Sequence, residues 1–326
     1  MEISNKLVSV CILTKNPGSV FKSVLDSVLR QKTVFDYEVV IVDSGSNDGT
    51  IEYVKNINSP IIKLIEIKPE DFGHGKTRNF AISQSKGDYI AMITHDANPT
   101  DESWLQHLIA PFADDEKIAG VFGRHYAYQD ATIFTKRDLK LHFDNFANGP
   151  KVVFLEDKQR YSSDIGYRQW LHYFSDNNAA LKRSVWEVCP YPDVDFAEDQ
   201  LWAKNIIERG YKKAYADNAV VYHSHNYDLN QTLRRSYDES RALKKLFGYK
   251  LCPSFLNIFY QTIACTKRDV SYQKNIAGDN SIKAFSYIIS WHFLKQLGYY
   301  LGDNFYTNKK IYNFLSLDNS LKRKGK

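Results

Sequence analysis

Short apolar runs and amphipathic stretches alternate along the first third of the chain. Four runs rich in Val and Ile lie at residues 7–14, 37–42, 61–67 and 88–94. Runs of this length, bounded by turn residues, are typical of strands that are buried on both faces. Between the runs, apolar residues recur at helical spacing near residues 19–31, 48–57 and 77–85. The alternation predicts an α/β fold with a doubly wound, mostly parallel sheet and helices on both faces.

The regular alternation ends near residue 115. A strand is predicted at 117–126, and "NNAALKR" is predicted as another strand after a long region of loop and helix. The helix "EDQLWAKNIIERG" and two short strands, "KKAYA" and "AVVYH", come next, and from about residue 228 the pattern is helical. We therefore expect one domain over 1–230, with parts at about 1–115 and 116–230, and a basic, aromatic-rich helical C-terminal region over 231–326.

Composition narrows the class of protein. With 43% hydrophobic residues among 326, the chain can bury a large core. No apolar run approaches the length of about 18 residues that a membrane span needs, and "MEISNKLVSV" is not a cleavable signal. The four cysteines lie far apart, which argues against a metal-binding or redox pair and favours a reducing, cytoplasmic compartment.

The net charge of +5 is unevenly distributed. Residues 241–326 contain 15 Lys and Arg against 4 Asp and Glu, a balance of +11, whereas residues 1–240 have a balance of −6. Aromatic residues are interleaved with the basic ones, so this region is predicted to dock on an anionic membrane surface. The alternative is that the aromatic side chains pack the helices onto the rest of the protein and the lysines are solvated. No nucleic-acid partner is expected.

Polar residues follow the ends of the predicted strands. In an open α/β sheet, ligands bind at the carboxyl ends of the strands. The candidates by this rule are Thr14 and Asn16, Asp43 and Ser44, the loop 68–78, Asp96, and the pair His223 and His225. These side chains suit phosphate and metal chemistry.

The loop "DFGHGKTRN" resembles a phosphate-binding loop only at its end. The motif G-x-x-x-x-G-K-[ST] requires a glycine at position 70, where this chain has Glu70. A dinucleotide fingerprint also fails, because "DSGSNDG" lacks the spacing G-x-G-x-x-G. What remains is a flexible loop at a helix N-terminus that carries Lys76 and Arg78. It suits an anionic nucleotide, although a solvated basic turn explains it equally well.

Acids and histidines open further alternatives. Asp195, Glu198 and Asp199 stand at the start of a predicted helix. Acids at this position interact favourably with the helix dipole and stabilise the helix by about 0.3–1 kcal/mol each. One of them could instead be a general base at a cleft.

His223 and His225 point the same way if the strand is extended, and with Asp96 they suit Mn²⁺ or Mg²⁺ once phosphates supply further ligands. Ordinary core or surface histidines are the alternative.

The order of these motifs resembles one enzyme family. The segments "VDSGSNDGT", "DFGHGKTRN", "THDANP", "AEDQLWA" and "HSHNY" resemble the inverting family 2 glycosyltransferases of GT-A fold over roughly residues 7–230. They look closest to the bacterial rhamnosyltransferases. The resemblance implies a GT-A catalytic domain over 1–230, with a nucleotide-sugar-binding part at about 1–115 and an acceptor part at about 116–230.

The resemblance also implies roles for particular residues. Asp43 and Arg78 would line the nucleoside pocket, although Ser44 replaces a frequent second acid of that motif. Asp96 keeps the last acid of the family's metal motif, with His95 where an acid often stands and a later histidine completing the shell. Asp199 is favoured over Glu198 as the base by family position alone, and only one can face the donor because adjacent helical residues point about 100° apart.

The implied reaction is an inverting, metal-dependent transfer of one 6-deoxyhexose, L-rhamnose from dTDP-L-rhamnose, to a glycan acceptor. A lipid-linked acceptor at the inner face of the cytoplasmic membrane would fit synthesis of a bacterial surface polysaccharide such as O-antigen or capsule. The pattern Q-x-x-R-W of processive members appears as "QTLRR", with Arg235 in place of Trp, which predicts single-sugar transfer. Arg234 could contact the diphosphate or belong to a basic helix face.

Three rival functions remain open from the sequence. A related transferase could use another nucleotide sugar, and a nucleotidyltransferase shares the sheet and the metal chemistry. The latter would need a glycine-rich basic loop after the first strand, of which "TKNPGSV" is a poor version. A non-enzymatic rival is a glycan-binding scaffold with a degenerate transferase domain, against which the intact acid, metal-type and basic positions argue.

Overall fold

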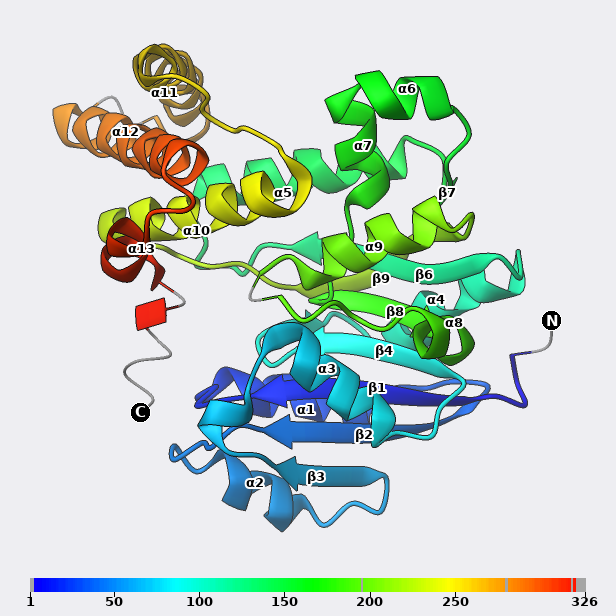
Figure 1. Cartoon of the computed structure of the whole chain (residues 1–326). Coiled ribbons are helices and arrows are strands. Elements are labelled where there is room, and N and C mark those ends of the chain that lie inside the picture. Colours follow the sequence, from blue (N-terminus) through cyan, green and yellow to red (C-terminus); the bar gives the residue numbers. More distant parts are fainter. Residues whose placement is uncertain (1–2, 195, 279–280, 318, 321–326) are drawn as a thin grey trace. The chain divides into compact units, whose positions relative to one another are not determined.

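The computed structural model describes residues 3–194, 196–278, 281–317 and 319–320 (Figure 1). The chain forms two compact units. The first comprises Met1–Ala131 and Thr135–Ser224, and the second comprises Thr132–Phe134 and His225–Lys326. The predicted boundary at residue 230 and the division of the catalytic domain near 115 stay predictions.

The first unit is built on one mixed sheet. Within the described residues the strand order is β3-β2-β1-β4-β8-β6-β9-β5, and β7 pairs with β9. The strands are β1 (Leu7–Thr14), β2 (Asp36–Asp43), β3 (Ile62–Glu66), β4 (Tyr89–Thr94), β5 (Asn98–Pro99), β6 (Ile118–Tyr126), β7 (Val152–Val153), β8 (Asn178–Lys182) and β9 (Lys212–Tyr222). The β1–β2, β1–β4, β2–β3 and β6–β9 pairs are parallel. The predicted α/β, mostly parallel sheet is confirmed.

Helices cover both faces of this sheet, as the alternation predicted (Figure 1). Successive residues of a strand point to opposite faces. Val8, Val10 and Ile12 of β1 therefore pack with α1 (Val20–Leu29) in one core, while Cys11 packs with α3 (His74–Ser83) in the other. The remaining helices of this unit are α2 (Thr50–Ile57), η1 (Pro69–Asp71), α4 (Trp104–Ile109), η2 (Ala110–Ala113), α5 (Ile133–Ala147), whose first two residues belong to the second unit, α6 (Lys158–Ser163), α7 (Ile165–His172), α8 (Arg183–Val188) and α9 (Glu198–Glu208).

One prediction about the strands was wrong. The segment "KKAYA" and the first four residues of "AVVYH" belong to a single strand, β9, instead of two, and His223 directly follows that strand. Its pairing with β6 shifts register, since Gly123 pairs with Ala216 and the next residue, Arg124, pairs with Val220. The residues of β9 between these two pairs have no partner in β6. They include Asp217, whose carboxylate accepts a 2.8 Å hydrogen bond from Arg124. The bulge keeps the strand continuous.

An antiparallel strand in the middle of the sheet decides what lies at its edge. β8 runs antiparallel to both β4 and β6, and Ile93 near the end of β4 pairs with Asn178 at the start of β8. The residues that precede β8 are therefore brought to the same edge as the residues that follow β4. The sequence gives no sign of this reversal of direction.

The second unit is helical, which confirms the predicted helical C-terminal region. Its helices are α10 (Leu229–Phe247), α11 (Phe255–Ala277), α12 (Ile282–Asn304) and α13 (Lys309–Leu315). α10 and α12 cross closely at glycines of α12, since a Cβ on Gly298 would lie 2.4 Å from the carbonyl oxygen of Leu233. Among the described residues, none of the helices combines the length and the apolar character needed to cross a membrane.

Candidate functional site

Asp43 organises the loops that follow β1 and β2. Its buried carboxylate accepts hydrogen bonds from the hydroxyls of Thr14 (2.7 Å) and Ser46 (2.6 Å). It also accepts from the backbone N–H groups of Gly45 (2.9 Å) and Ser46 (2.7 Å). Gly45 has a φ of 87°, a left-handed conformation that glycine adopts without strain. Both oxygens of Asp43 are engaged within the protein, and its predicted contact with a nucleoside stays a prediction.

The other predicted residues of the β1 and β2 ends lie around Asp43. Ser44 donates from its N–H and its hydroxyl to the carbonyl oxygen of Thr14, both at 3.0 Å. Asn16 is exposed, has a φ of 43°, and accepts from the N–H of Asn47 at 2.7 Å. Thr14, Asn16, Asp43 and Ser44 thus form one interlocked pair of loops at the carboxyl edge of the sheet.

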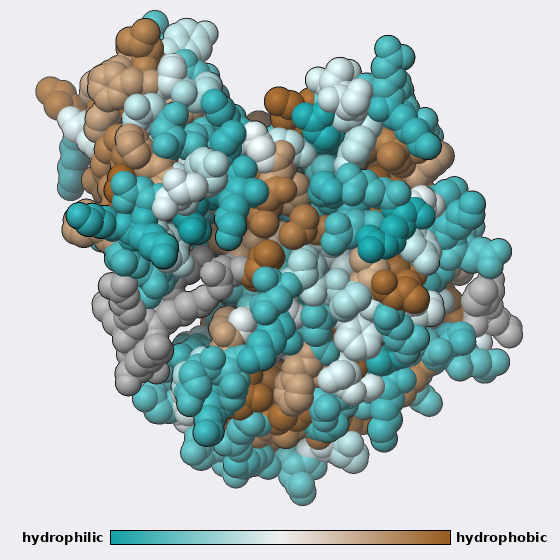
Figure 2. All heavy atoms as spheres, in the orientation of Figure 1, coloured by the Kyte–Doolittle hydropathy of each residue, from teal (hydrophilic) through white to brown (hydrophobic). Residues whose placement is uncertain are grey.

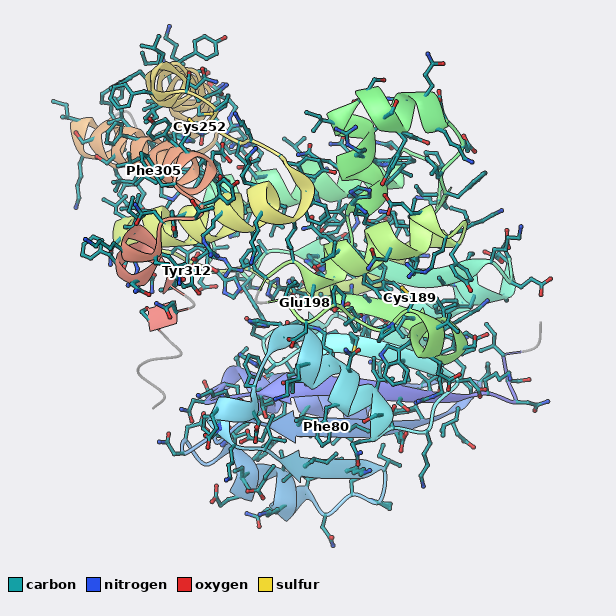
Figure 3. All side chains as sticks on the ribbon, in the orientation of Figure 1. Phe80, Cys189, Glu198, Cys252, Phe305 and Tyr312 are labelled. Atoms are coloured by element: carbon teal, nitrogen blue, oxygen red, sulfur yellow. The ribbon has the colours of Figure 1, made fainter. Side chains whose placement is uncertain are left out.

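A buried arginine joins α3, the segment that precedes β8, and α9. The guanidinium of Arg78 lies 2.8 Å from a carboxylate oxygen of Asp176 and 2.5 Å from one of Glu198. The side chains of all three residues are less than one-tenth exposed. Figure 3 shows Glu198 at the start of α9. Because Arg78 is enclosed by two acids, it holds these elements together, and its predicted place in the nucleoside pocket stays a prediction.

Close backbone packing sets the position of α3 at this site. A Cβ on Gly75 would lie 2.0 Å from the carbonyl oxygen of Pro192, so only glycine permits this approach. Asn79 then accepts from the N–H of Tyr191 at 3.0 Å and donates to its carbonyl oxygen at 2.8 Å. The "GHGKTRN" motif therefore encodes the docking of α3 on the loop before α9.

The acids around Arg78 influence one another. The pKa of Asp199 is raised well above its ordinary value by burial and by the charges of Glu198 and Asp176, although Arg78 opposes the shift. Burial raises the pKa of Asp176 to about 6, against the charge of Arg78. Asp176 also accepts a 2.7 Å hydrogen bond from the hydroxyl of Tyr191. Glu198 is ion-paired, whereas Asp199 accepts from backbone N–H groups of Asp176 (3.2 Å) and Gln200 (2.7 Å).

Asp96 and His223 come together at the ends of β4 and β9. The Nε2 atom of His223 lies 3.7 Å from a carboxylate oxygen of Asp96, and both side chains are partly exposed. The other ring nitrogen of His223 lies 3.4 Å from the amide nitrogen of Asn177. On the other side, the hydroxyl of Tyr128 donates to the carbonyl oxygen of Asp96 at 2.9 Å. His95 instead approaches the carbonyl oxygen of Leu13 at 3.2 Å.

The donor set of this pair fits a divalent cation. Two bonds of about 2.1 Å each can span up to about 4.2 Å between two ligand atoms, so one ion can contact both Asp96 and His223. Carboxylate and imidazole are ligands of Mn²⁺. Asn177 lies beside the ring nitrogen of His223 that faces away from Asp96, the position from which a neighbouring residue orients a metal-binding histidine. His225 belongs to the second unit, yet its Cα lies within about 7 Å of the Cα of His223 because only Ser224 separates them.

Two predicted residues have other contacts. Lys76 is exposed and lies 3.9 Å from Asp71. Arg234, in the second unit, donates to the carbonyl oxygens of Leu315 (2.9 Å) and Ser316 (2.8 Å) at the end of α13. The guanidinium therefore caps a helix, which neither sequence alternative included, and its contact with a diphosphate stays a prediction. Asp195 lies outside the described residues.

Asp176, Asn177 and Tyr191 belong to the site but were not predicted from the sequence. The first two precede β8, and the rule that ligands lie at carboxyl ends of strands does not select the start of a strand. A signal was present in "SDNNAALKR", where an acid and an amide directly precede the strand that begins at Asn178. Tyr191 carried no signal in the sequence.

A polar groove with exposed aromatic rings borders the ends of β6 and β9. It has a volume of about 570 Å³ and is lined mainly by Arg124, Tyr126, Lys136, Lys140, Asp144, Asp217 and Tyr222. The rings of Tyr126 and Tyr222 lie 6.3 Å apart, and Tyr222 stacks on Tyr128 at 6.0 Å. Tyr222 directly precedes His223, whose N–H donates to the carbonyl oxygen of Tyr126 at 2.8 Å. The groove therefore adjoins the Asp96–His223 pair.

Replacing Arg78 by Met is expected to destabilise the protein by about 3–5 kcal/mol, because two buried carboxylates lose the charge that compensates them. Chemical denaturation at neutral pH measures the change. The deficit should shrink as the pH is lowered, since protonation removes the repulsion between Asp176 and Glu198. Lys76→Met, on the exposed side of the same helix, is the control and should change stability by less than about 0.5 kcal/mol.

Comparison with known proteins identifies the family. The model of the family described as "Glycosyl transferase family 2" matches residues 9–189, more than half of the chain. The chain belongs to glycosyltransferase family 2. It is 33% identical over 235 residues to the O-antigen chain rhamnosyltransferase RfbN of Salmonella typhimurium, covering 71% of this chain and 70% of that protein. It is 30% identical over 234 residues to the O-antigen chain rhamnosyltransferase WbaN of Salmonella anatum, with coverage of 71% and 70%.

The fold of this family 2 glycosyltransferase agrees with a solved relative. The mannosyltransferase PcManGT from Pyrobaculum calidifontis, in complex with GDP-Man and Mn²⁺, aligns with a TM-score of 0.60. The alignment covers 92% of this chain and 88% of that chain at 17% identity, so it bears on the fold alone. The predicted GT-A fold and family are confirmed, and glycosyl transfer is favoured over the nucleotidyltransferase and scaffold alternatives.

Proposed function

We propose that this glycosyltransferase moves a single L-rhamnose from dTDP-L-rhamnose, with inversion, to a lipid-linked glycan acceptor in the synthesis of a bacterial surface polysaccharide. The observation that carries the proposal is the arrangement at the sheet edge. A base candidate, Asp199, and a cation-binding pair, Asp96 and His223, belong to elements that meet through β8. The similarity to two O-antigen chain rhamnosyltransferases supports the choice of sugar.

In this reaction Asp199 would accept the proton of the acceptor hydroxyl as that oxygen attacks the anomeric carbon. Glu198 is the less suitable base, since its carboxylate is paired with Arg78 inside the protein. Asp176 and Glu198 raise the proton affinity of Asp199, which makes its ionised form a stronger base. The structure thus supports on physical grounds a choice that the sequence supported only by resemblance.

Asp96 and His223, with His225 as a further candidate, would hold a divalent ion, Mg²⁺ or Mn²⁺. When bound, such an ion supplies positive charge to the leaving nucleoside diphosphate. Asn177 and Tyr128 would keep the two side chains in position by contacts to the His223 ring and to the Asp96 carbonyl oxygen. The Mn²⁺ of the mannosyltransferase complex is consistent with this assignment.

The groove beside Tyr126 and Tyr222 is the proposed place of the acceptor glycan. Tyrosine rings offer an apolar face with a polar tip, which suits the mixed surface of a sugar. Asp144, Asp217 and Arg124 line the same groove and offer acceptors and donors to hydroxyl groups. This assignment agrees with an acceptor part over about 116–230.

The donor is tested by the nucleotide that binds. In the presence of Mn²⁺, calorimetric titration should give tighter binding of dTDP than of GDP, and among nucleotide sugars dTDP-L-rhamnose should release nucleoside diphosphate fastest. In this proposal the nucleotide contacts the loops that follow β1 and β2, which are joined by the hydrogen bond between Asn16 and Asn47. A clear preference for GDP, or for a UDP-hexose, would overturn the donor assignment while leaving the family unchanged.

A further inference from the structure

Helix α11 has an unusual distribution of polar and apolar residues. Its buried positions are Ile258, Thr262, Thr266 and Asp269, three of them polar. Its exposed positions carry large apolar side chains in its first nine residues: Phe255 (57% exposed), Leu256 (77%), Phe259 (45%), Tyr260 (70%) and Ile263 (53%). We call these five residues the outer face of α11. A helix on a water-soluble surface normally has the opposite arrangement, with its apolar stripe turned inward.

The buried side of α11 has a structural explanation. Asp269 is fully buried and lies 3.0 Å from Nε2 of His292 in α12 and 2.6 Å from Arg268. The contact with His292 joins α11 to α12, whereas Arg268 belongs to α11 itself, and the rings of Phe259 and Phe293 also lie 6.2 Å apart. The outer face therefore cannot turn inward without separating the buried Asp269 and His292 side chains, which is destabilising because a buried polar group loses its hydrogen-bond partner.

The outer face is large enough to indicate a partner. Its members are spaced i, i+1, i+4, i+5 and i+8, which places them on one side of the helix over more than two turns. Apolar residues gather over α11 and α12 in Figure 2. Contiguous exposed apolar surface of this kind marks a site of contact with a protein or a membrane.

The charge around the outer face selects an anionic membrane. Further along α11, exposed positions carry Lys267, Arg268 and Lys274, and Lys283 is exposed at the start of α12. Of the described residues after 241, the acids are Asp269 and Asp303, and both are buried. Asp303 accepts from the hydroxyl of Ser240 at 2.6 Å and from the N–H of Cys252 at 2.6 Å. The accessible charge of this part is therefore almost entirely positive.

We infer that the outer face of α11 inserts into the interfacial layer of an anionic lipid bilayer, with Lys267 and Lys274 contacting lipid phosphates. Aromatic and aliphatic side chains beside basic ones are the composition of helices that lie in the plane of a membrane. Each basic residue near an anionic surface adds to the attraction. This inference deepens the proposed function, because it names the surface that would bring the enzyme to a lipid-linked acceptor.

Vesicle binding by the full chain tests the inference. The protein is sedimented with vesicles of phosphatidylcholine alone and of phosphatidylcholine mixed with phosphatidylglycerol. Binding should require phosphatidylglycerol and fall at high salt, because salt screens the attraction. The double variant Leu256→Ser/Tyr260→Ser should bind at least about tenfold more weakly, since burying one large apolar side chain is itself worth about that factor. Both residues are exposed, so the variant should fold normally.

Matched variants separate the contributions. Val34→Ser and Leu141→Ser remove exposed apolar side chains from the first unit (66% and 55% exposed) and should leave vesicle binding unchanged. Lys267→Gln/Lys274→Gln should weaken binding and reduce its dependence on salt. Equal binding of all variants, or equal recovery with neutral and anionic vesicles at low salt, would overturn the inference.

Two measurements distinguish this failure from others. If the chain is a dimer in solution by light scattering and Leu256→Ser/Tyr260→Ser is a monomer without any lipid effect, the outer face is a contact between copies and the inference is wrong. Release of nucleoside diphosphate from dTDP-L-rhamnose without vesicles tests the proposed function separately. The double variant should keep that rate, whereas a chain that binds vesicles but acts on no donor would overturn only the proposed function.

Discussion

Asp199→Asn should reduce turnover by about 10²–10⁴-fold while leaving nucleotide binding nearly unchanged. The range is that of a lost general base, and an amide of the same shape keeps the hydrogen bond with the N–H of Asp176. The measurement is the initial rate of nucleoside diphosphate release at saturating acceptor, together with a calorimetric titration of dTDP. The KM for the donor should therefore hardly change.

The pH dependence of the same reaction gives a second readout. Asp199 acts as a base only when it is ionised, and its pKa is raised by burial and by the charges of Glu198 and Asp176. The acidic limb of kcat/KM should therefore lie at a higher pH than that of an ordinary carboxyl group. Asp176→Asn removes one of the charges that raise this pKa, so the limb should move to lower pH.

Glu198→Gln is the companion variant. It should disturb the pair with Arg78 and reduce stability, yet keep measurable turnover, because the base is retained. An inactive Glu198→Gln beside an active Asp199→Asn would show that the roles are reversed. Their positions differ in this structure, since Glu198 is enclosed with Arg78 whereas Asp199 is only partly enclosed.

The second large effect is expected at the cation-binding pair. Loss of a residue that only orients a metal ligand weakens metal binding by about 10–100-fold. Asp96 is a proposed ligand itself, so Asp96→Ala should weaken the binding of Mn²⁺ by more than that range. Donor binding should weaken with it, because the diphosphate charge is less well neutralised. Calorimetric titration of Mn²⁺ into the protein, with and without dTDP, measures the change independently of activity.

His95→Ala is the matched control, one residue away. His95 contacts the carbonyl oxygen of Leu13 and is not among the proposed ligands, so its removal should have a much smaller effect on Mn²⁺ affinity. Full activity in an excess of chelator would contradict the requirement for a metal. If the two variants lost Mn²⁺ affinity equally, the cause would be a movement of the loop after β4 and not the removal of one ligand.

Whether a site residue could be predicted from the sequence depended on the direction of the strand beside it. Thr14 and Asp43 end parallel strands and Asp96 follows one, so the rule for carboxyl ends predicted from the sequence that they share one edge. Asp176 and Asn177 precede β8, so they reach the same edge only because β8 is antiparallel. Strand direction depends on the pairing of segments far apart in the chain, which local patterns do not contain.

Local pattern determined the α/β alternation, the buried strands and the helical C-terminal part, because hydrophobic spacing reflects the face that each element buries. Motif resemblance added the family. The tertiary structure alone decided that Arg78 is enclosed by Asp176 and Glu198, since three elements supply those residues. It also decided the outer face of α11. Composition showed aromatics and lysines there, but only the packing of Asp269 against His292 determines which side of the helix is left exposed.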